Sequence, residues 1–159
     1  MKPLKTRLMS WIESTFPAEE AHAHCDGPCG IYDPASARIA AEAVLSMTRK
    51  ILDLASNNAD APDSVAYQNT LSRYIAIKEQ EAQKAKEELL ILWTDYFKPP
   101  HLEQYPDLHD IFWNAAKLCS AVKVEVNLEK AEELLATIEK IHGIFWATKG
   151  RDVPWITAG

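Results

Sequence analysis

Cysteine, glycine and long apolar runs are scarce in this chain. Only three cysteines occur among 159 residues, which is too few for a disulfide-scaffolded secreted domain, and their number is odd. We therefore expect a reducing compartment and a cytoplasmic location. No apolar run approaches the roughly 20 residues that span a bilayer. No run of Lys and Arg suggests nucleic-acid binding, so neither a membrane nor a nucleic acid is an expected partner.

The residues that are abundant indicate one helical domain. Hydrophobic residues make up 47% of the chain and charged residues 25%, as in ordinary globular proteins, and the formal net charge is −6. A chain of this length can bury a substantial core. With only five glycines and long segments rich in Ala, Glu, Lys and Leu, the sequence predicts an all-α fold.

Four stretches carry apolar residues at three- and four-residue steps, which predicts four helices. They cover about residues 34–55, 64–96, 106–122 and 127–149. Because short connections join most of them, we expect an antiparallel up-down four-helix bundle, formed by residues 24–159 as one domain. The stripe predicted to be buried in the first helix consists of Ile39, Ala43, Val44, Met47, Ile51 and Leu54.

Polar residues and prolines predict where these helices begin and end. Asp33, which precedes a proline, is expected to cap the first helix. Asp63 and Asn127 are expected to cap the second and the fourth. Pro99 and Pro100 are expected to end the second helix, because proline cannot continue the hydrogen-bond ladder.

The first 23 residues have the charged start and the Ala-His-Ala end of a secretory leader, but not its apolar middle. Ser10, Glu13 and Ser14 interrupt the stretch where a signal peptide needs about 7–15 apolar residues. Two interpretations remain for residues 1–23. They are either a loosely held amino-terminal extension or a propeptide that ends at Ala23.

The densest group of metal-binding residue types follows directly. His24, Cys25 and Cys29 fall within six positions, and the glycines and proline among them favour a tight loop. The two cysteines form a regulatory disulfide, a metal-binding pair or two incidental free thiols. The imidazole favours a metal, because nitrogen and thiolate donors suit nickel, copper and zinc. Structural zinc would require four side chains. Asp26 is a hard oxygen donor and is expected to shape the loop beside the ligands.

The backbone could supply the missing donors. If the chain is cleaved after Ala23, His24 gains a free α-amine. That amine, the deprotonated amide nitrogen of Cys25 and the sulfurs of Cys25 and Cys29 could form a square plane, a geometry that suits Ni(II). The His24 ring could then approach the metal from the axial side.

Other residue types that can carry chemistry have simpler interpretations. Tyr32 either packs the loop against the first helix or lines the open face of a metal site. His101, His109 and His142 are expected to make capping or core contacts, and Cys119 to be a small buried hydrophobe. The large aromatic residues at helical spacing are expected in the core or in subunit contacts: Trp93, Phe112, Trp113, Phe145 and Trp146.

The loop from His24 to Pro34, His-Cys-Asp-Gly-Pro-Cys-Gly-Ile-Tyr-Asp-Pro, resembles the metal-binding hook of nickel superoxide dismutases. The resemblance covers essentially all of residues 24–149. The further stretches that carry it are residues 37–39, 77–80, 92–101, 105–109 and 144–149.

This resemblance implies an enzyme. It implies a four-helix-bundle subunit of a homohexamer, with one nickel ion per hook at residues 24–32, a leader removed by a protease, and superoxide as the substrate. Superoxide would be disproportionated to dioxygen and hydrogen peroxide while nickel alternates between Ni(II) and Ni(III).

The resemblance also implies particular roles. His24 would supply its amine and its imidazole, Cys25 its amide nitrogen and sulfur, and Cys29 the second sulfur. Tyr32 and Tyr96 would border the substrate pocket. In addition, Lys98 would help to draw in the anion.

Two positions depart from the pattern of the better-known members. Ala40 replaces a glutamate that accepts a hydrogen bond from the axial imidazole, and Glu81 replaces the arginine that braces this glutamate. Because groups of this kind orient a ligand ring, we infer that the Glu81 carboxylate reaches the His24 ring across the space left at Ala40.

Two other functions fit the same residues. The first is a non-catalytic nickel or copper carrier that uses the same amino-terminal chelate. The second is a helical adaptor in which Cys25 and Cys29 form a redox switch.

Overall fold

The computed structural model describes residues 30–57 and 63–158. All regular structure within these ranges is helical. The elements in chain order are α2 (Ala35–Asn57), α3 (Val65–Ile91), the π-helical turn η1 (Leu92–Tyr96), α4 (Pro99–Gln104), α5 (Leu108–Val124) and α6 (Leu128–Thr148).

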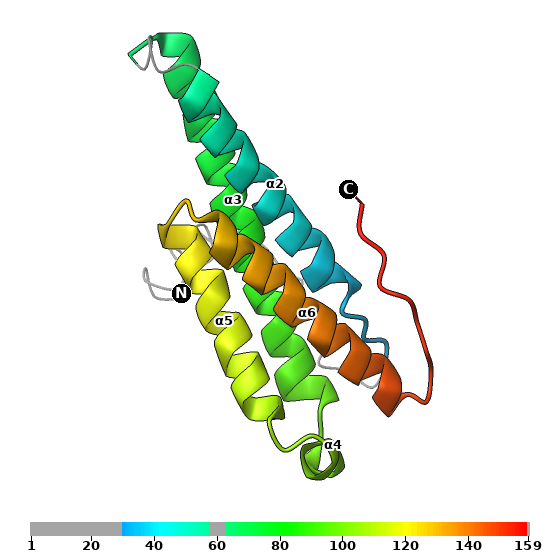
Figure 1. Ribbon diagram of the computed structural model, residues 1–159. Coiled ribbons are helices and arrows are strands. Elements are labelled where there is room, and N and C mark those ends of the chain that lie inside the picture. Colours follow the sequence, from blue (N-terminus) through cyan, green and yellow to red (C-terminus); the bar gives the residue numbers. More distant parts are fainter. Residues whose placement is uncertain (1–29, 58–62, 159) are drawn as a thin grey trace, which may run out of the picture.

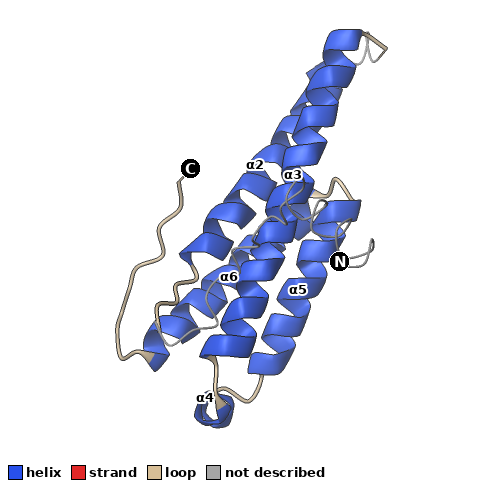
Figure 2. Cartoon of the chain, turned by 180° about the vertical axis from the view of Figure 1, so that it is seen from behind, coloured by secondary structure: helices blue, strands red, loops and turns tan. Residues whose placement is uncertain are grey.

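The long helices α2, α3, α5 and α6 of the described chain form a bundle (Figure 1). Both α2 and α5 pack against α3 and α6, so the four helices surround one core. The α2–α3 hairpin extends beyond the other two helices, and the short α4 lies at the opposite end of the bundle (Figure 2). The predicted all-α bundle is therefore confirmed. No helix among the described residues is both long and apolar enough to cross a bilayer.

Small residues allow α2 to approach its neighbours closely. Ala37, Ala40 and Ala41 are fully buried, followed along the same face by Val44. The prediction for Ile39 was wrong, because its side chain is 55% exposed. The predicted buried stripe of this helix follows mainly large apolar residues. The helix instead turns Ala37, Ala40 and Ala41 towards the core, and Ile39 faces outwards.

The helix caps match the sequence at two of three positions. The Ala35 N–H donates to Asp33 Oδ1 at 2.8 Å, and the Lys130 N–H donates to Asn127 Oδ1 at 3.0 Å. The cap predicted at Asp63 was wrong, because Ser64 has the extended backbone of a cap and accepts from the Tyr67 N–H at 3.2 Å. Both residue types can cap, so composition alone did not separate neighbouring positions.

The end of the second predicted helix differs from expectation. The α-helix ends at Ile91 and continues as a π-helical turn, η1, to Tyr96. The two prolines then open α4, a helix that the sequence analysis did not predict. Proline suits the first turn of a helix, where an N–H would have no intrahelical partner. The Lys98 N–H closes this turn by donating to His101 Nδ1 at 3.1 Å.

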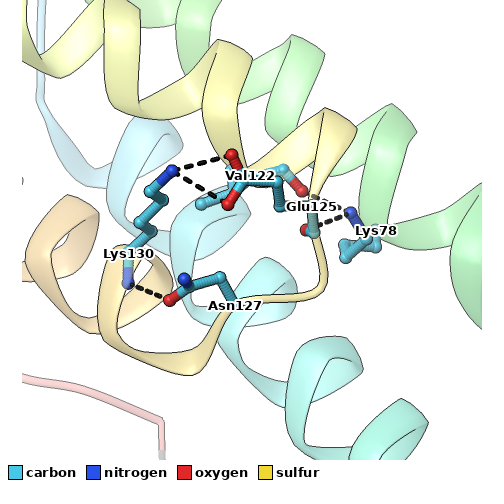
Figure 3. Close-up of polar contacts among 5 residues, drawn as sticks. All are labelled: Lys78, Val122, Glu125, Asn127 and Lys130. Atoms are coloured by element: carbon cyan, nitrogen blue, oxygen red, sulfur yellow. Dashed lines mark hydrogen bonds and ion pairs between the residues drawn. The ribbon is translucent and has the colours of Figure 1, made fainter.

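A buried lysine ties α3 to the carboxyl end of α5 (Figure 3). The side chain of Lys78 is 1% exposed, and its ammonium donates to the carbonyls of Val122, Lys123 (3.0 Å) and Glu125 (3.1 Å). Burial lowers the pKa of Lys78, partly offset by the nearby Glu79 carboxylate. The Lys78 cation also complements the negative end of the α5 dipole.

The last nine described residues pack along the bundle as a C-terminal strap, residues 150–158 (Figure 1). Gly150 leaves α6 with a φ of +64°, a conformation that glycine adopts without strain. The strap is held at three points. His142 Nε2 lies 2.9 Å from the Val153 carbonyl, the Arg38 guanidinium lies over the Trp155 ring, and the Ala158 N–H donates to Glu42 at 2.6 Å.

Candidate metal centre and adjoining tyrosine cluster

The predicted ligands precede the first described residue. His24, Cys25, Asp26 and Cys29 lie outside the described residues, as does the predicted leader, so the assignments made for them stay predictions. The described chain begins at Gly30, one residue after Cys29. Within the described ranges, no group of three or more His, Cys, Asp or Glu side chains could hold a metal ion.

The structure brings the two predicted pocket tyrosines together. The Tyr32 ring lies 5.7 Å from the Tyr96 ring, centroid to centroid, although the two residues are far apart in sequence. Ile31 between the hook and this contact is 75% exposed, whereas Tyr32 is half-buried against the core. The chain therefore enters the bundle at the Tyr32–Tyr96 contact.

The η1 turn and the end of α6 fix the position of Tyr96. Its hydroxyl lies 2.6 Å from Thr148 Oγ1, and the Thr148 hydroxyl donates to the Phe145 carbonyl at 2.6 Å. Since a threonine hydroxyl has one proton, Tyr96 is the donor to Thr148. The ring of Tyr96 also packs 4.5 Å from Phe145 and 5.5 Å from His101.

Two lysines lie close to Tyr96. Lys98 follows it by two residues and is exposed. Lys149, which the sequence analysis did not single out, places its ammonium 5.1 Å from the centroid of the Tyr96 ring and 5.1 Å from that of Phe145. Neither Thr148 nor Lys149 could be connected to Tyr96 from sequence, because the contacts join the last helix to a turn about fifty residues earlier.

The two positions that depart from the family pattern differ in environment. Ala40 is fully buried in the core. The Glu81 side chain on α3 is 28% exposed, and its carboxylate lies 3.9 Å from Lys84 Nζ, at the long limit of an ion pair. Because His24 is not described, the contact inferred between Glu81 and its ring stays a prediction.

The remaining candidates make the structural contacts expected of them. Cys119 is fully buried, and burial raises the pKa of its thiol to about 12. His101 accepts a hydrogen bond at the start of α4, His109 packs against Trp93, and His142 holds the strap. Cys119 is thus a poor thiolate ligand, which leaves Cys25 and Cys29 as the thiols available to a metal.

The described residues form an all-helical bundle with a tyrosine pair where the described chain enters it, and the predicted nickel-type donors precede this point by a few residues in the sequence. The family model for nickel-containing superoxide dismutase matches residues 19–149. The chain belongs to this family, which confirms the family, the enzyme class and the nickel cofactor expected from the sequence.

Individual relatives agree with this result. The chain is 44% identical over 133 residues to "Superoxide dismutase [Ni]" of Streptomyces seoulensis, a match that covers 84% of this chain and 93% of the relative. The protein of the same name from Streptomyces coelicolor is 43% identical over the same shares. A crystal structure of a Ni-containing superoxide dismutase in the oxidized state superimposes with a TM-score of 0.68 and 44% identity, covering 80% of this chain and all of that one.

Proposed function

We propose that His24, Cys25 and Cys29 hold the nickel ion in a hook at residues 24–32, and that superoxide is disproportionated there. The family match carries the activity. The donor types support the position of the site, because two thiolates and an imidazole are soft and borderline ligands of the kind that nickel prefers. The burial of Cys119 supports the choice of cysteines, since this thiol is closed off from a metal at the surface.

When bound, nickel supplies a one-electron redox couple between Ni(II) and Ni(III), which thiolate donors stabilise. For each pair of superoxide ions, one loses an electron and becomes dioxygen. The other gains that electron and takes up two protons to become hydrogen peroxide. The protein must therefore attract an anion and give it protons.

Tyr32 and Tyr96 are assigned to the anion and its protons. The Tyr96 hydroxyl donates its proton to Thr148, so its oxygen can accept a hydrogen bond from a water molecule. The two rings lie in contact where the described chain enters the bundle. We assign Tyr32 and Tyr96 to ordering water, the proton source, next to the hook. Lys98 adds positive charge on the exposed side.

Glu81 is assigned to orient the His24 ring. A carboxylate on the ring N–H fixes the orientation of a ligating histidine and raises its basicity. The alanine at position 40 and the weak contact of Glu81 with Lys84 support this role, because no strong partner among the described residues holds the carboxylate. Asp26 is assigned to shaping the loop.

Removal of residues 1–23 by a protease is part of the proposal, because the α-amine of His24 exists only after cleavage. Protein that begins at His24 should bind nickel and disproportionate superoxide, whereas protein that retains residues 1–23 should lack activity with ample nickel present. Equal activity of the two forms would contradict the amine ligand. Nickel binding without turnover by the cleaved form would indicate a carrier, and activity changes that need no metal would indicate a redox switch.

We also propose that the subunits assemble in the cytoplasm as a homohexamer. An apolar cavity of about 240 Å³ between α3 and α5 supports a subunit contact there, flanked by Leu90 at 40% and Trp113 at 57% exposure. Light scattering of the cleaved, nickel-loaded protein should give six chains per particle. A monomer at working concentration would exclude the assembly.

A further inference from the structure

We propose that Lys149 is a positioning residue for the reaction, which holds the Tyr96 ring and adds an unneutralised positive charge where superoxide approaches. The inference rests on the proposed function, because it requires that the hook lies beside Tyr32 and Tyr96.

The side chain of Lys149 is directed back over two rings of the cluster. Lys149 is the C-cap of α6, directly after Thr148, and its ammonium lies 5.1 Å from the ring centroids of both Tyr96 and Phe145. An ammonium within about 6 Å of an aromatic face is attracted by the ring quadrupole. A cation at this end of the helix also complements the α6 dipole. These two attractions favour the observed side-chain position.

Two consecutive residues, Thr148 at the end of α6 and its C-cap Lys149, therefore hold Tyr96 in two ways. Thr148 accepts the hydrogen bond of the Tyr96 hydroxyl, and Lys149 contacts the face of its ring. A swing of the Tyr96 side chain about its Cα–Cβ bond would break both contacts. Since Tyr96 is the partner of Tyr32, restraint of Tyr96 also restrains the surface against which Tyr32 packs.

The charge of Lys149 remains available to an anion. Lys149 is exposed, and none of the ion pairs among the described residues involves it. A ring contact orients an ammonium without neutralising it, unlike a carboxylate. In a chain with a net charge of −6, such local cations decide where a small anion approaches the surface.

The test compares Lys149→Met, Lys149→Arg and Lys140→Met in nickel-loaded protein that begins at His24. The second-order rate constant for superoxide is measured by pulse radiolysis across a range of ionic strengths. Lys149→Met should lower it about threefold to tenfold at low salt, and the difference should shrink as salt screens the charge. Lys149→Arg keeps both the charge and the ring contact, so it should restore most of the rate.

Lys140→Met is the matched control, because it removes the same charge from the same helix. Lys140 precedes Lys149 by nine residues, about 13 Å along the axis, and already pairs with Asp107 at 3.0 Å. At about 0.1 M salt the Debye length is about 10 Å, which is shorter than that separation, so the rate of Lys140→Met measured there should stay near wild type.

A second measurement uses the nickel-free protein and does not depend on activity. The ε-methylene protons of Lys149 should show ring-current shifts by NMR, and Tyr96→Leu should reduce them. Random-coil shifts in the unsubstituted protein would overturn the contact. If Lys149→Met lowers the rate constant equally at all salt concentrations, and Lys149→Arg does not restore it, Lys149 contributes only to stability. That result would overturn the proposal.

The result for Cys29→Ser separates this inference from the function on which it rests. If Cys29→Ser is inactive while Lys149→Met has normal kinetics at every salt concentration, the role of Lys149 fails and the hook stands. If Cys29→Ser keeps full activity, the proposed site itself fails.

Discussion

The buried Lys78 offers the sharpest test of how the bundle is held together. Its ammonium satisfies three backbone carbonyls where α5 ends, a place where the helix itself provides no N–H partners. Lys78→Met keeps most of the side-chain volume and removes the donors. The variant thus isolates the loss of the polar contact from the cavity that alanine would leave.

The expected magnitude follows from the groups left behind. Hydrogen bonds from a charged donor contribute about 1.5–3 kcal/mol each, but one ammonium supplies all three, and its own burial opposes them. We therefore expect Lys78→Met to lower the free energy of unfolding by about 2–4 kcal/mol. For a domain stabilised by about 5–15 kcal/mol this is a large fraction.

The assay is urea unfolding of nickel-free protein, followed by circular dichroism at one fixed protein concentration, because assembly also shifts apparent stability. Lys84→Met on the same helix is the control, since its side chain is 54% exposed and makes only a 3.9 Å ion pair. Its free energy of unfolding should change by less than about 0.5 kcal/mol. If the two variants unfold at the same urea concentration, Lys78 does not stabilise the end of α5 and the reasoning is wrong.

Three further predictions concern the hook, its support and the strap. Cys29→Ser should abolish superoxide disproportionation, because a hydroxyl is a hard, weakly basic donor. Cys119→Ser should keep the nickel absorption spectrum and lower only the stability of the protein. The opposite pattern would place the metal elsewhere. Glu81→Gln should lower activity about 10- to 100-fold while nickel content, measured by atomic absorption, stays near wild type; normal activity would refute the contact with the His24 ring. Trp155→Ala removes the ring that packs against Arg38 and His142. Amide hydrogen exchange should therefore accelerate in the strap and in the first turns of α2. Unchanged exchange would show that the strap does not stabilise α2.

The helices could be predicted from sequence because their signals are local. The repeat of apolar residues and the caps at Asp33 and Asn127 lie within a few residues of the structure that they determine. The errors arose where two local signals compete or where a signal has two meanings. Asp63 and Ser64 are both good caps, and Pro99 with Pro100 can end one helix and also begin the next.

The surroundings of the site were less predictable, because they join distant parts of the chain. The family resemblance named Tyr32 and Tyr96, and the structure places their rings in contact. Thr148 and Lys149 carry no local signal for that contact, since a threonine and a lysine at the end of an amphipathic helix are ordinary surface residues. Lys78 likewise falls on a helical stripe in sequence, and only the three carbonyls at the end of α5 explain why a cation is buried there.

The contact between Tyr32 and Tyr96 also limits where the proposed nickel site can lie. Consecutive Cα atoms are about 3.8 Å apart, so the Cα of Cys29 must lie within about 11 Å of that of Tyr32. A metal held by the Cys29 sulfur is therefore confined to the end of the bundle where η1 and the end of α6 meet. This restriction follows from the covalent chain alone and holds for any conformation of residues 24–29. Tyr96 and the Lys149 ammonium lie together at that end of the bundle, and Lys98 follows Tyr96 by two residues. The same restriction applies to Glu81. For the proposed contact, the His24 ring must reach Glu81 on α3 while residues 24–31 connect it to Tyr32.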